Sequence, residues 1–222
     1  MKKLFLAIRH GESETVRQLI EKNPELVNCT AKQPPKKDDG QSPLQVALKT
    51  GQLEIADYLI KRNADLNFMA ADSCCNDWRA PVLHDAVIAA VMCSRWNTLD
   101  RLMGFRVFST EEKALQAYAV LEKMLQRGAD VNGVDSFGYS VLFRFCLQAE
   151  QILPTWIRNE HREANDHVLT EELREDLKRI LNLLKKAGAD PAYRAPILGR
   201  SVLAYYQEGS LAMLLKEAFE NA

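Results

Sequence analysis

The sequence predicts an all-α solenoid, in which short helix pairs are stacked in one row. Three observations support this fold class. A triplet that opens a helix recurs along the chain, a stop signal recurs after it, and the segments in between are too short to form helices that are stable alone in water. Each pair must therefore bury its apolar side against a neighbour, and a stack of this kind needs a repeated sequence.

The most complete unit spans residues 40–67. Gly40 suits a turn that needs a positive φ angle. Ser42 and Pro43 start a helix well, because the hydroxyl can accept a hydrogen bond from a first-turn amide and proline loses no hydrogen bond at the first helical position. Asn63 follows the second helix, at the position where glycine commonly ends one. The stretch therefore predicts a turn, two helices and a stop.

The same signals recur along the rest of the chain. Residues 2–28 hold a degenerate copy of the unit, and three further copies follow the complete one. The openers are Ser42-Pro43-Leu44, Pro81-Val82-Leu83, Ser140-Val141-Leu142 and Ser201-Val202-Leu203, and the stops begin at Asn63, Gly128 and Gly188.

Taken together, these residues resemble ankyrin repeats, with their turn glycine, their Ser/Thr-Pro-Leu opener and their Gly-Ala-Asp-Val-Asn ending. Only the second unit matches this pattern over its full length. The resemblance implies a stack of helix pairs with β-turn fingers, and a chain that binds other proteins. We expect a single ankyrin-repeat domain over residues 1–222, with about five units near residues 2–28, 40–67, 80–132, 138–190 and 199–220.

The two central units are enlarged. The opener and the stop lie 22 residues apart between Pro43 and Asp65, but 48 and 49 residues apart in the third and fourth units. Thr110 and Thr170, each followed by two glutamates, predict long second helices that lie side by side. The first helices are expected to be longer too, over residues 82–96 and 141–157, with Pro154 kinking or ending the later one. The extra length should form a lobe that contains Trp96, Leu99, Leu102, Phe105, Val107, Phe108, Trp156 and Ile157.

The first two finger loops are longer than the third. The distance from the stop asparagine to the next opener is 15 residues in both, but only 9 after Asn132. Equal lengthening predicts that the two long fingers lie side by side and extend one surface. An alternative is that Phe68, Met69 and Trp78 pack beneath their own loop. The expected partner-binding residues are Lys36, Lys37, Asp38, Asp39, Phe68, Met69, Trp78, Arg79, Asp135, Ser136 and Phe137.

Composition narrows the class of partner. A formal net charge of −1 argues against a nucleic-acid partner, and no apolar run is long enough to span a membrane. The apolar start of the chain is interrupted at Arg9 and is too short for a signal peptide, so we expect a first helix there. The five cysteines show neither metal spacing nor a paired framework, which is typical of a reduced cytosol. We expect a cytoplasmic monomer with no membrane partner, no cofactor and no metal.

No catalytic motif is present. The sequence has no phosphate-binding glycine loop, no nucleophile elbow and no metalloprotease motif, so we expect no catalytic residue. His84 follows an opener, and the resemblance implies that it bonds to the backbone of a neighbouring turn. His161 and His167 are six residues apart and would lie on different faces of a helix. Cys74 and Cys75 are expected to be two free thiols.

Two hypotheses follow. The first is a non-enzymatic protein-interaction module that uses the fingers and the concave face of the stack. The second is an enzyme or small-ligand carrier, whose site lies in the lobe of the enlarged units. A pocket with paired ionisable groups would favour the second hypothesis. A regulator, a toxin-neutralising protein and an effector on a host partner are not distinguished by the residues. The polar candidates for the lobe site are His84, Asp85, Arg95, Arg101 and Arg106.

Overall fold

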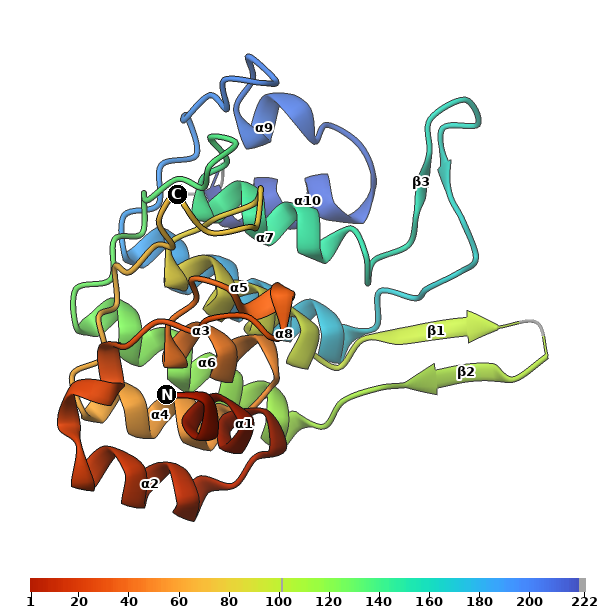
Figure 1. Cartoon of the computed structure of the whole chain (residues 1–222). Coiled ribbons are helices and arrows are strands. Elements are labelled where there is room, and N and C mark those ends of the chain that lie inside the picture. Colours follow the sequence, from red (N-terminus) through yellow and green to blue (C-terminus); the bar gives the residue numbers. More distant parts are fainter. Residues whose placement is uncertain (101, 220–222) are drawn as a thin grey trace.

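The computed structural model of the chain describes residues 1–100 and 102–219, and these residues are mostly helical (Figure 1). The α-helices are α1 (Lys2–His10), α2 (Ser13–Lys22), α3 (Pro43–Lys49), α4 (Leu53–Lys61), α5 (Val82–Cys93), α6 (Glu111–Gln126), α7 (Val141–Ala149), α8 (Glu171–Lys186), α9 (Val202–Tyr205) and α10 (Gly209–Phe219). Two short 3₁₀ helices, η1 (Pro24–Asn28) and η2 (Lys36–Asp38), precede α3, and four short strands are β1 (Asn97–Asp100), β2 (Gly104–Val107), β3 (Trp156–Ile157) and β4 (Arg162–Glu163).

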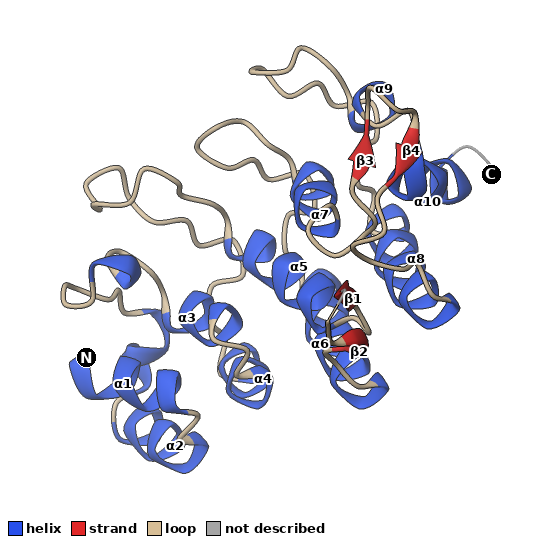
Figure 2. Cartoon of the chain, turned by 90° about the vertical axis from the view of Figure 1, so that its right-hand side faces the viewer, coloured by secondary structure: helices blue, strands red, loops and turns tan. Residues whose placement is uncertain are grey.

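The helices form two parallel rows. One row contains α1, α3, α5, α7 and α9, and each of these contacts the next. The other row contains α2, α4, α6, α8 and α10, again with contacts between neighbours. Figure 2 shows the pairs following one another from the N-terminus to the C-terminus, with long loops on one side of the stack. This arrangement fits the predicted all-α repeat fold.

The openers start helices in the way that the sequence predicts. The Ser42 hydroxyl accepts a hydrogen bond from the Gln45 amide, and the Gln45 side chain accepts one from the Ser42 amide in return. The hydroxyls of Ser140 and Ser201 cap α7 and α9 in the same manner. Thr110 and Thr170 cap α6 and α8, which confirms that they mark the starts of the two long second helices.

The stop signals join each unit to the next. Asn63, Gly128 and Gly188 all have positive φ angles, of 64°, 91° and 90°. An asparagine at the end of one unit then donates to the carbonyl at this position of the next stop and accepts from the amide two residues later. Such pairs of hydrogen bonds link Asn28 to Asn63 and Asp65, Asn67 to Gly128 and Asp130, and Asn132 to Gly188 and Asp190.

The buried side chains form one continuous core along the stack. Helix α5 is buried on nearly all sides, because it contacts α3, α6, α7 and α8. Its sequence, apolar except for His84 and Asp85, follows from this position, because a helix packed between layers has almost no solvent face. Helices α6 and α8 are equally long and touch each other, as predicted. The matched positions in both are buried: Ala117, Val120, Leu121 and Met124 in α6, and Leu177, Ile180, Leu181 and Leu184 in α8.

The predicted bounds of the lengthened first helices, residues 82–96 and 141–157, are wrong, although α5 and α7, with 12 and 9 residues, are longer than α3 with 7. Helix α5 ends at Cys93 and α7 ends at Ala149, five residues before Pro154. The inserted residues form two antiparallel hairpins instead, β1–β2 and β3–β4, which project from the end of the helix pairs away from the long loops (Figure 1). They do not form one buried lobe, because Leu99, Leu102, Phe105, Val107 and Phe108 are exposed.

Candidate functional site

The finger loops lie side by side along one edge of the stack. We call residues 29–41 the first finger, 68–80 the second and 133–139 the third. The Asp39 carboxylate accepts a hydrogen bond from the Cys75 amide at 3.0 Å, and the Asp39 carbonyl accepts one from the Asn76 side chain at 3.1 Å. Gly40 has a φ angle of 76° and lies so close to Cys74 that a side chain would collide with it. These contacts confirm that the two long fingers are neighbours.

The second and third fingers are joined just as closely. The Ser136 amide donates to the Arg79 carbonyl at 2.8 Å, and the Ser136 hydroxyl accepts from the Arg79 amide at 3.1 Å. The same hydroxyl donates to the Asp77 carbonyl at 3.0 Å. Each finger is therefore held by its neighbour, and the edge is preorganised.

The centre of this edge is a buried carboxylate. Asp135 is 4% exposed and accepts four hydrogen bonds, from the amides of Phe137 and Tyr139, from the Trp78 indole at 2.8 Å and from Arg144 at 2.7 Å. Burial alone would raise the pKa of Asp135, but these donors hold the pKa below its usual range. Two cations also lie near the Trp78 ring, Lys49 at 5.1 Å and Arg144 at 4.7 Å from its centroid.

The structure divides the expected binding residues into two groups. Asp38 and Asp135 are buried and paired with Arg9 and Arg144, so the expectation that they meet a partner is revised. The sequence does not distinguish a finger aspartate that faces solvent from one that accepts hydrogen bonds within the fold. Trp78, Arg79, Phe68, Met69, Asp39 and Ser136 are half-buried, while Lys36, Lys37 and Phe137 are exposed.

Two ionisable side chains lie in the core next to the fingers. The His84 Nε2 is 3.0 Å from the Gly133 carbonyl, which confirms the implied bond to a neighbouring turn. Burial lowers the pKa of His84 to about 4. Asp85 accepts from Gln45 at 3.0 Å and lies 3.8 Å from the Lys49 ammonium, and burial raises its pKa to about 6. Both side chains are enclosed by the stack, which favours a structural role for each.

The polar residues proposed for an enlarged lobe do not converge. Arg95 forms a two-pronged ion pair with Asp176 of α8, with both N–O distances at 2.9 Å. Arg106 is exposed on β2, and Arg101 lies outside the described residues. Polar groups meet elsewhere, in a cleft of about 450 Å³ between the second hairpin and the last helices. It contains the pair Tyr206–Glu150, with an O–O distance of 3.0 Å, and Glu208 within reach of His161 and Trp156.

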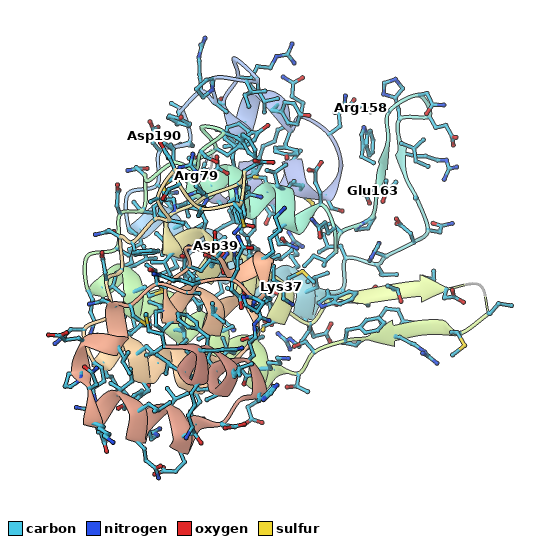
Figure 3. All side chains as sticks on the ribbon, viewed as in Figure 1. Lys37, Asp39, Arg79, Arg158, Glu163 and Asp190 are labelled. Carbon is cyan, nitrogen blue, oxygen red and sulfur yellow. The ribbon has the colours of Figure 1, made fainter. Side chains whose placement is uncertain are left out.

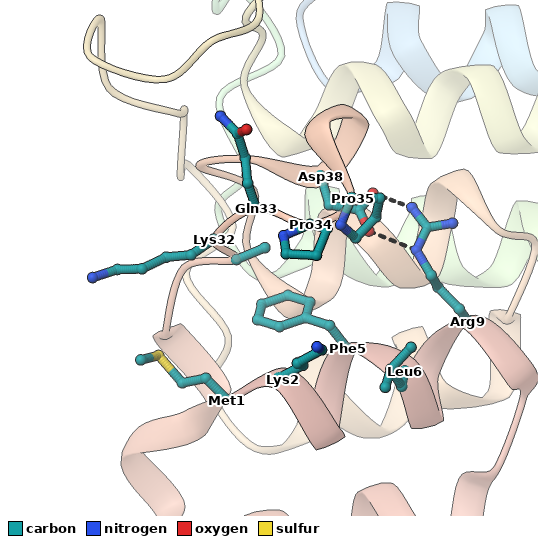
Figure 4. A pocket seen from close by; sticks show the side chains of 11 residues that line it. Met1, Lys2, Phe5, Leu6, Arg9, Lys32, Gln33, Pro34, Pro35 and Asp38 are labelled. Atoms are coloured by element: carbon teal, nitrogen blue, oxygen red, sulfur yellow. Dashed lines mark hydrogen bonds and ion pairs between the residues drawn. The ribbon is translucent and has the colours of Figure 1, made fainter.

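A smaller cavity of about 210 Å³ lies between α1 and the first finger (Figure 4). Its walls are mainly apolar, with Phe5, Leu6 and Pro34 among them, and the Arg9–Asp38 ion pair closes one side. Because both charged groups bond to each other, the cavity offers an apolar side chain a place but gives it little orientation.

The first hairpin carries an exposed apolar surface that the sequence did not lead us to predict. In the first hairpin, Leu99, Leu102, Met103, Phe105, Val107 and Phe108 are 39 to 93% exposed. The alternation of Phe105, Arg106 and Val107 after a glycine is a strand signal that could have identified it. The second hairpin carries charged residues instead. In Figure 3, its Arg158 and Glu163 lie well apart from Asp39 and Arg79 of the fingers.

The described residues contain no group of three or more histidines, cysteines and acids placed to hold a metal ion. Within residues 1–100 and 102–219, no helix combines the length and the apolar character that crossing a membrane requires. All five cysteines are free, which confirms two separate thiols at Cys74 and Cys75.

A comparison with protein families places part of the chain. A family model described as ankyrin repeats (3 copies) matches residues 2–70. The matched segment begins with α1, contains the first finger and ends at the start of the second finger.

Proposed function

We propose that the chain is a non-enzymatic interaction module, because its residues 2–70 match a family model of ankyrin repeats, and domains of that family generally bind other proteins and are typically non-enzymatic. The partner would bind along the finger edge and the adjoining concave face. The observation that carries the proposal is the continuous bonding from the first finger to the third through Asp39, Ser136 and Asp135. A surface that is ordered before binding loses little conformational entropy on association.

The contact residues in this proposal are those that reach solvent. Lys36 and Lys37 at the first finger and Phe137 at the third are exposed, Phe137 by 44%. Phe68, Met69, Arg79 and the outer side of Trp78 would line the surface between them. Asp39 and Ser136 would act by holding the fingers together. Aromatic side chains near the centre of such a patch commonly dominate binding energy.

Further features belong to the same proposal. We treat the chain as one domain with five units, of which the two that carry hairpins are enlarged. We propose that it acts as a cytoplasmic monomer without cofactor, nucleic-acid partner or membrane partner. The near-zero net charge supports the absence of a nucleic-acid partner, and the five free cysteines support the location.

The experiment that tests the module is a capture followed by a binding measurement. Partners captured on the full chain would be identified by mass spectrometry, purified and titrated calorimetrically. Phe137→Ala, and Lys36→Glu combined with Lys37→Glu, should each weaken binding by about tenfold or more, with the melting temperature unchanged. Leu115→Ala is the matched control, because Leu115 is 42% exposed on α6, outside the finger edge. Equal affinities for the finger variants and this control would overturn the proposal.

Trp78 needs a separate expectation. The indole donates to buried Asp135, so Trp78→Ala removes a hydrogen bond from a charged group as well as a binding surface. We expect this variant to lose about 2 kcal/mol of stability in addition to any affinity. Phe137→Ala is therefore the cleaner probe of partner binding.

The cleft beside the second hairpin supports a second candidate, a small-ligand carrier. It combines the half-buried ring of Trp156 with the carboxylates of Glu150 and Glu208, and burial raises the pKa of Glu150. A library of small polar and aromatic compounds would be screened by thermal shift. A compound that stabilises the chain but not Tyr206→Phe or Glu150→Gln would support this candidate, and a screen without such a compound would remove it.

A further inference from the structure

The first hairpin has one apolar face without a partner. We define this hairpin as residues 96–108, the strands β1 and β2 with their flanking pair Trp96 and Phe108. In its register, Leu99 faces Phe105 and Asn97 faces Val107. Leu99, Phe105 and Val107 therefore project from the same face, and they are 39, 49 and 50% exposed. An isolated two-stranded hairpin is marginally stable in water, so this exposed face is not explained by the needs of folding.

The backbone hydrogen bonds show which strand edge is open. The Leu99 amide donates to the Asp166 carbonyl at 2.7 Å, so it points away from β2. The Phe108 amide donates to the Trp96 carbonyl at 2.9 Å, so even-numbered residues of β2 point toward β1. By the alternation of an antiparallel pair, the amides and carbonyls of Phe105 and Val107 point outward. Within the described part of the chain, nothing pairs with this outer edge.

The opposite edge of the hairpin already contacts another segment of the chain. Besides the bond from Leu99 to Asp166, the Asn97 side chain donates to the Val168 carbonyl at 2.7 Å and accepts from the Val168 amide at 2.8 Å. Residues 166–168 therefore lie along the base of β1 and occupy part of its outer edge. The β2 edge offers the same kind of backbone groups, without a covering segment.

The charges near this edge are uneven. Asp100 is occupied, because its carboxylate accepts from the amides of Leu102 and Met103 and closes the turn. Arg106 is exposed on β2, on the face opposite Phe105 and Val107. A strand added beside β2 would place one of its side chains directly next to Arg106. An acidic residue at that position would be favourable, and a basic one unfavourable.

We propose that the outer edge of β2 binds an extended segment of another protein as an added antiparallel strand. The segment carries apolar residues at the two positions that flank an aspartate or glutamate, which lies beside Arg106. The apolar residues cover Phe105 and Val107, and the backbone of the segment pairs with their outward amides and carbonyls. The first hairpin projects beyond the ends of the helices, apart from the finger loops, so the site does not depend on the fingers (Figure 1).

Two other occupants fit the edge less well. A lipid surface would cover the apolar face but offers no regular series of backbone donors and acceptors. In a second copy of this chain, the register that pairs Phe105 with Val107 in both directions would bring the two Arg106 side chains directly opposite each other. Like charges in that position are destabilising.

The test uses the full chain and a phage-displayed library of random 12-residue peptides. Selected peptides would be synthesised and titrated by fluorescence anisotropy. We expect an apolar–acidic–apolar pattern in them, and Val107→Pro should weaken their binding by about tenfold, because it removes one outward amide without touching the bonds to β1. Arg106→Glu should weaken binding similarly, and a peptide with arginine in place of its acidic residue should restore it.

Matched variants separate the outcomes. Phe137→Ala should leave peptide affinity unchanged, so a failure of the finger surface and a failure of this edge are distinguishable. Phe105→Thr keeps strand propensity but removes the apolar ring, and it should also weaken binding with an unchanged melting temperature. The proposal is overturned if selected peptides bind Val107→Pro as well as the original chain. It is equally overturned if Val107→Pro abolishes a dimer seen by sedimentation, or if phosphatidylglycerol vesicles bind the chain and peptides do not.

Discussion

The finger edge of this stack differs from its hairpin edge, the side from which the two hairpins project, in how its polar groups are paired. Both consist of loops that leave the helical core, and both contain backbone groups that need partners. At the finger edge, hydrogen bonds join each finger to the next, and the buried Asp135 accepts from four donors, of which the Trp78 indole comes from the neighbouring finger. At the hairpin edge, the first hairpin keeps an apolar face and a strand edge in solvent. The contrast shows that one scaffold can carry a satisfied surface and an unsatisfied one.

The two hairpins differ for a similar reason. The second hairpin is held by the last unit, because Trp156 donates to Glu208 and Glu163 accepts from the Ser210 amide at the start of α10. Gly209 allows this contact, since the Trp156 ring lies 3.2 Å from where a side chain would begin. The first hairpin is held mainly at its base, through Asn97 and the Trp96–Phe108 stack. The contacts of the second hairpin thus extend to the last unit, whereas those of the first gather at its base.

Among the changes that test this comparison, the removal of Asp135 should have the largest effect on stability. Asp135→Ala leaves Arg144 and the Trp78 indole without their partner in a buried place. We expect a loss of about 3 to 5 kcal/mol in the free energy of unfolding, measured by urea denaturation. A loss below about 1 kcal/mol would mean that the finger edge is not held by this carboxylate.

A pH titration tests the buried charges beside the fingers. The folded-state pKa of Asp85 is about 6, above its ordinary 3.8, so the folded protein takes up a proton first as the pH falls through this window and the Asp85 contribution to stability rises. The folded-state pKa of His84 is about 4, below 6.5, so the unfolded chain is protonated first and the His84 contribution falls between about pH 6.5 and 4. The two contributions oppose each other in the original chain.

Replacing Asp85 would reveal the contribution of His84 to the pH dependence of stability. Asp85→Asn keeps the shape of the side chain and removes its titration. Between pH 7 and pH 4.5 the variant should lose about 2 kcal/mol more stability than the original chain. Urea denaturation at both pH values measures this difference, and Asp57→Asn, a partly exposed carboxylate on α4, serves as the control. Parallel pH profiles for Asp85→Asn and the original chain would contradict the assignment.

A smaller effect is expected where the units are joined at their stops. Asn132→Ala removes the pair of hydrogen bonds to Gly188 and Asp190, both of which are exposed to solvent. Exposed hydrogen bonds contribute modestly, so we expect a loss of about 1 kcal/mol. The analogous change Asn67→Ala should lower the stability by a similar amount. Thermal unfolding of the two variants measures whether these asparagine hydrogen bonds contribute equally along the stack.

The smallest effect on stability is expected at the hairpin edge. Phe105→Ser replaces a side chain that is half exposed, so the free energy of unfolding should change by less than about 0.5 kcal/mol. Chemical denaturation provides the measurement. A loss above about 2 kcal/mol would show that the first hairpin contributes to the core, and the contrast between the two edges would then disappear.

Local signals predicted the elements that depend on neighbours in sequence. Ser42, Thr110 and Thr170 marked helix starts correctly, because a cap uses only the next three residues. Asn63 marked a helix end for the same reason. The ends of α5 and α7 were misplaced, because apolar residues recur a few positions beyond each helix, at Trp96 after α5 and at Ile152 and Leu153 after α7. Ser94 and Arg95 turn away from α5, and the turn is stabilised by Asp176 on a distant helix, which no local pattern contains.

The sequence by itself determined the repeat, the order of the helices and the matched faces of α6 and α8, since these follow from spacing and from the burial that short helices need. The tertiary structure alone decided which polar side chains are buried and paired within the fold and which reach solvent. Asp135 and Asp39 are both finger aspartates in the sequence, yet one is enclosed by four donors and the other stays half-buried. Burial and pairing depend on neighbours brought together by the fold, from more than fifty residues away in the case of Trp78 and Asp135.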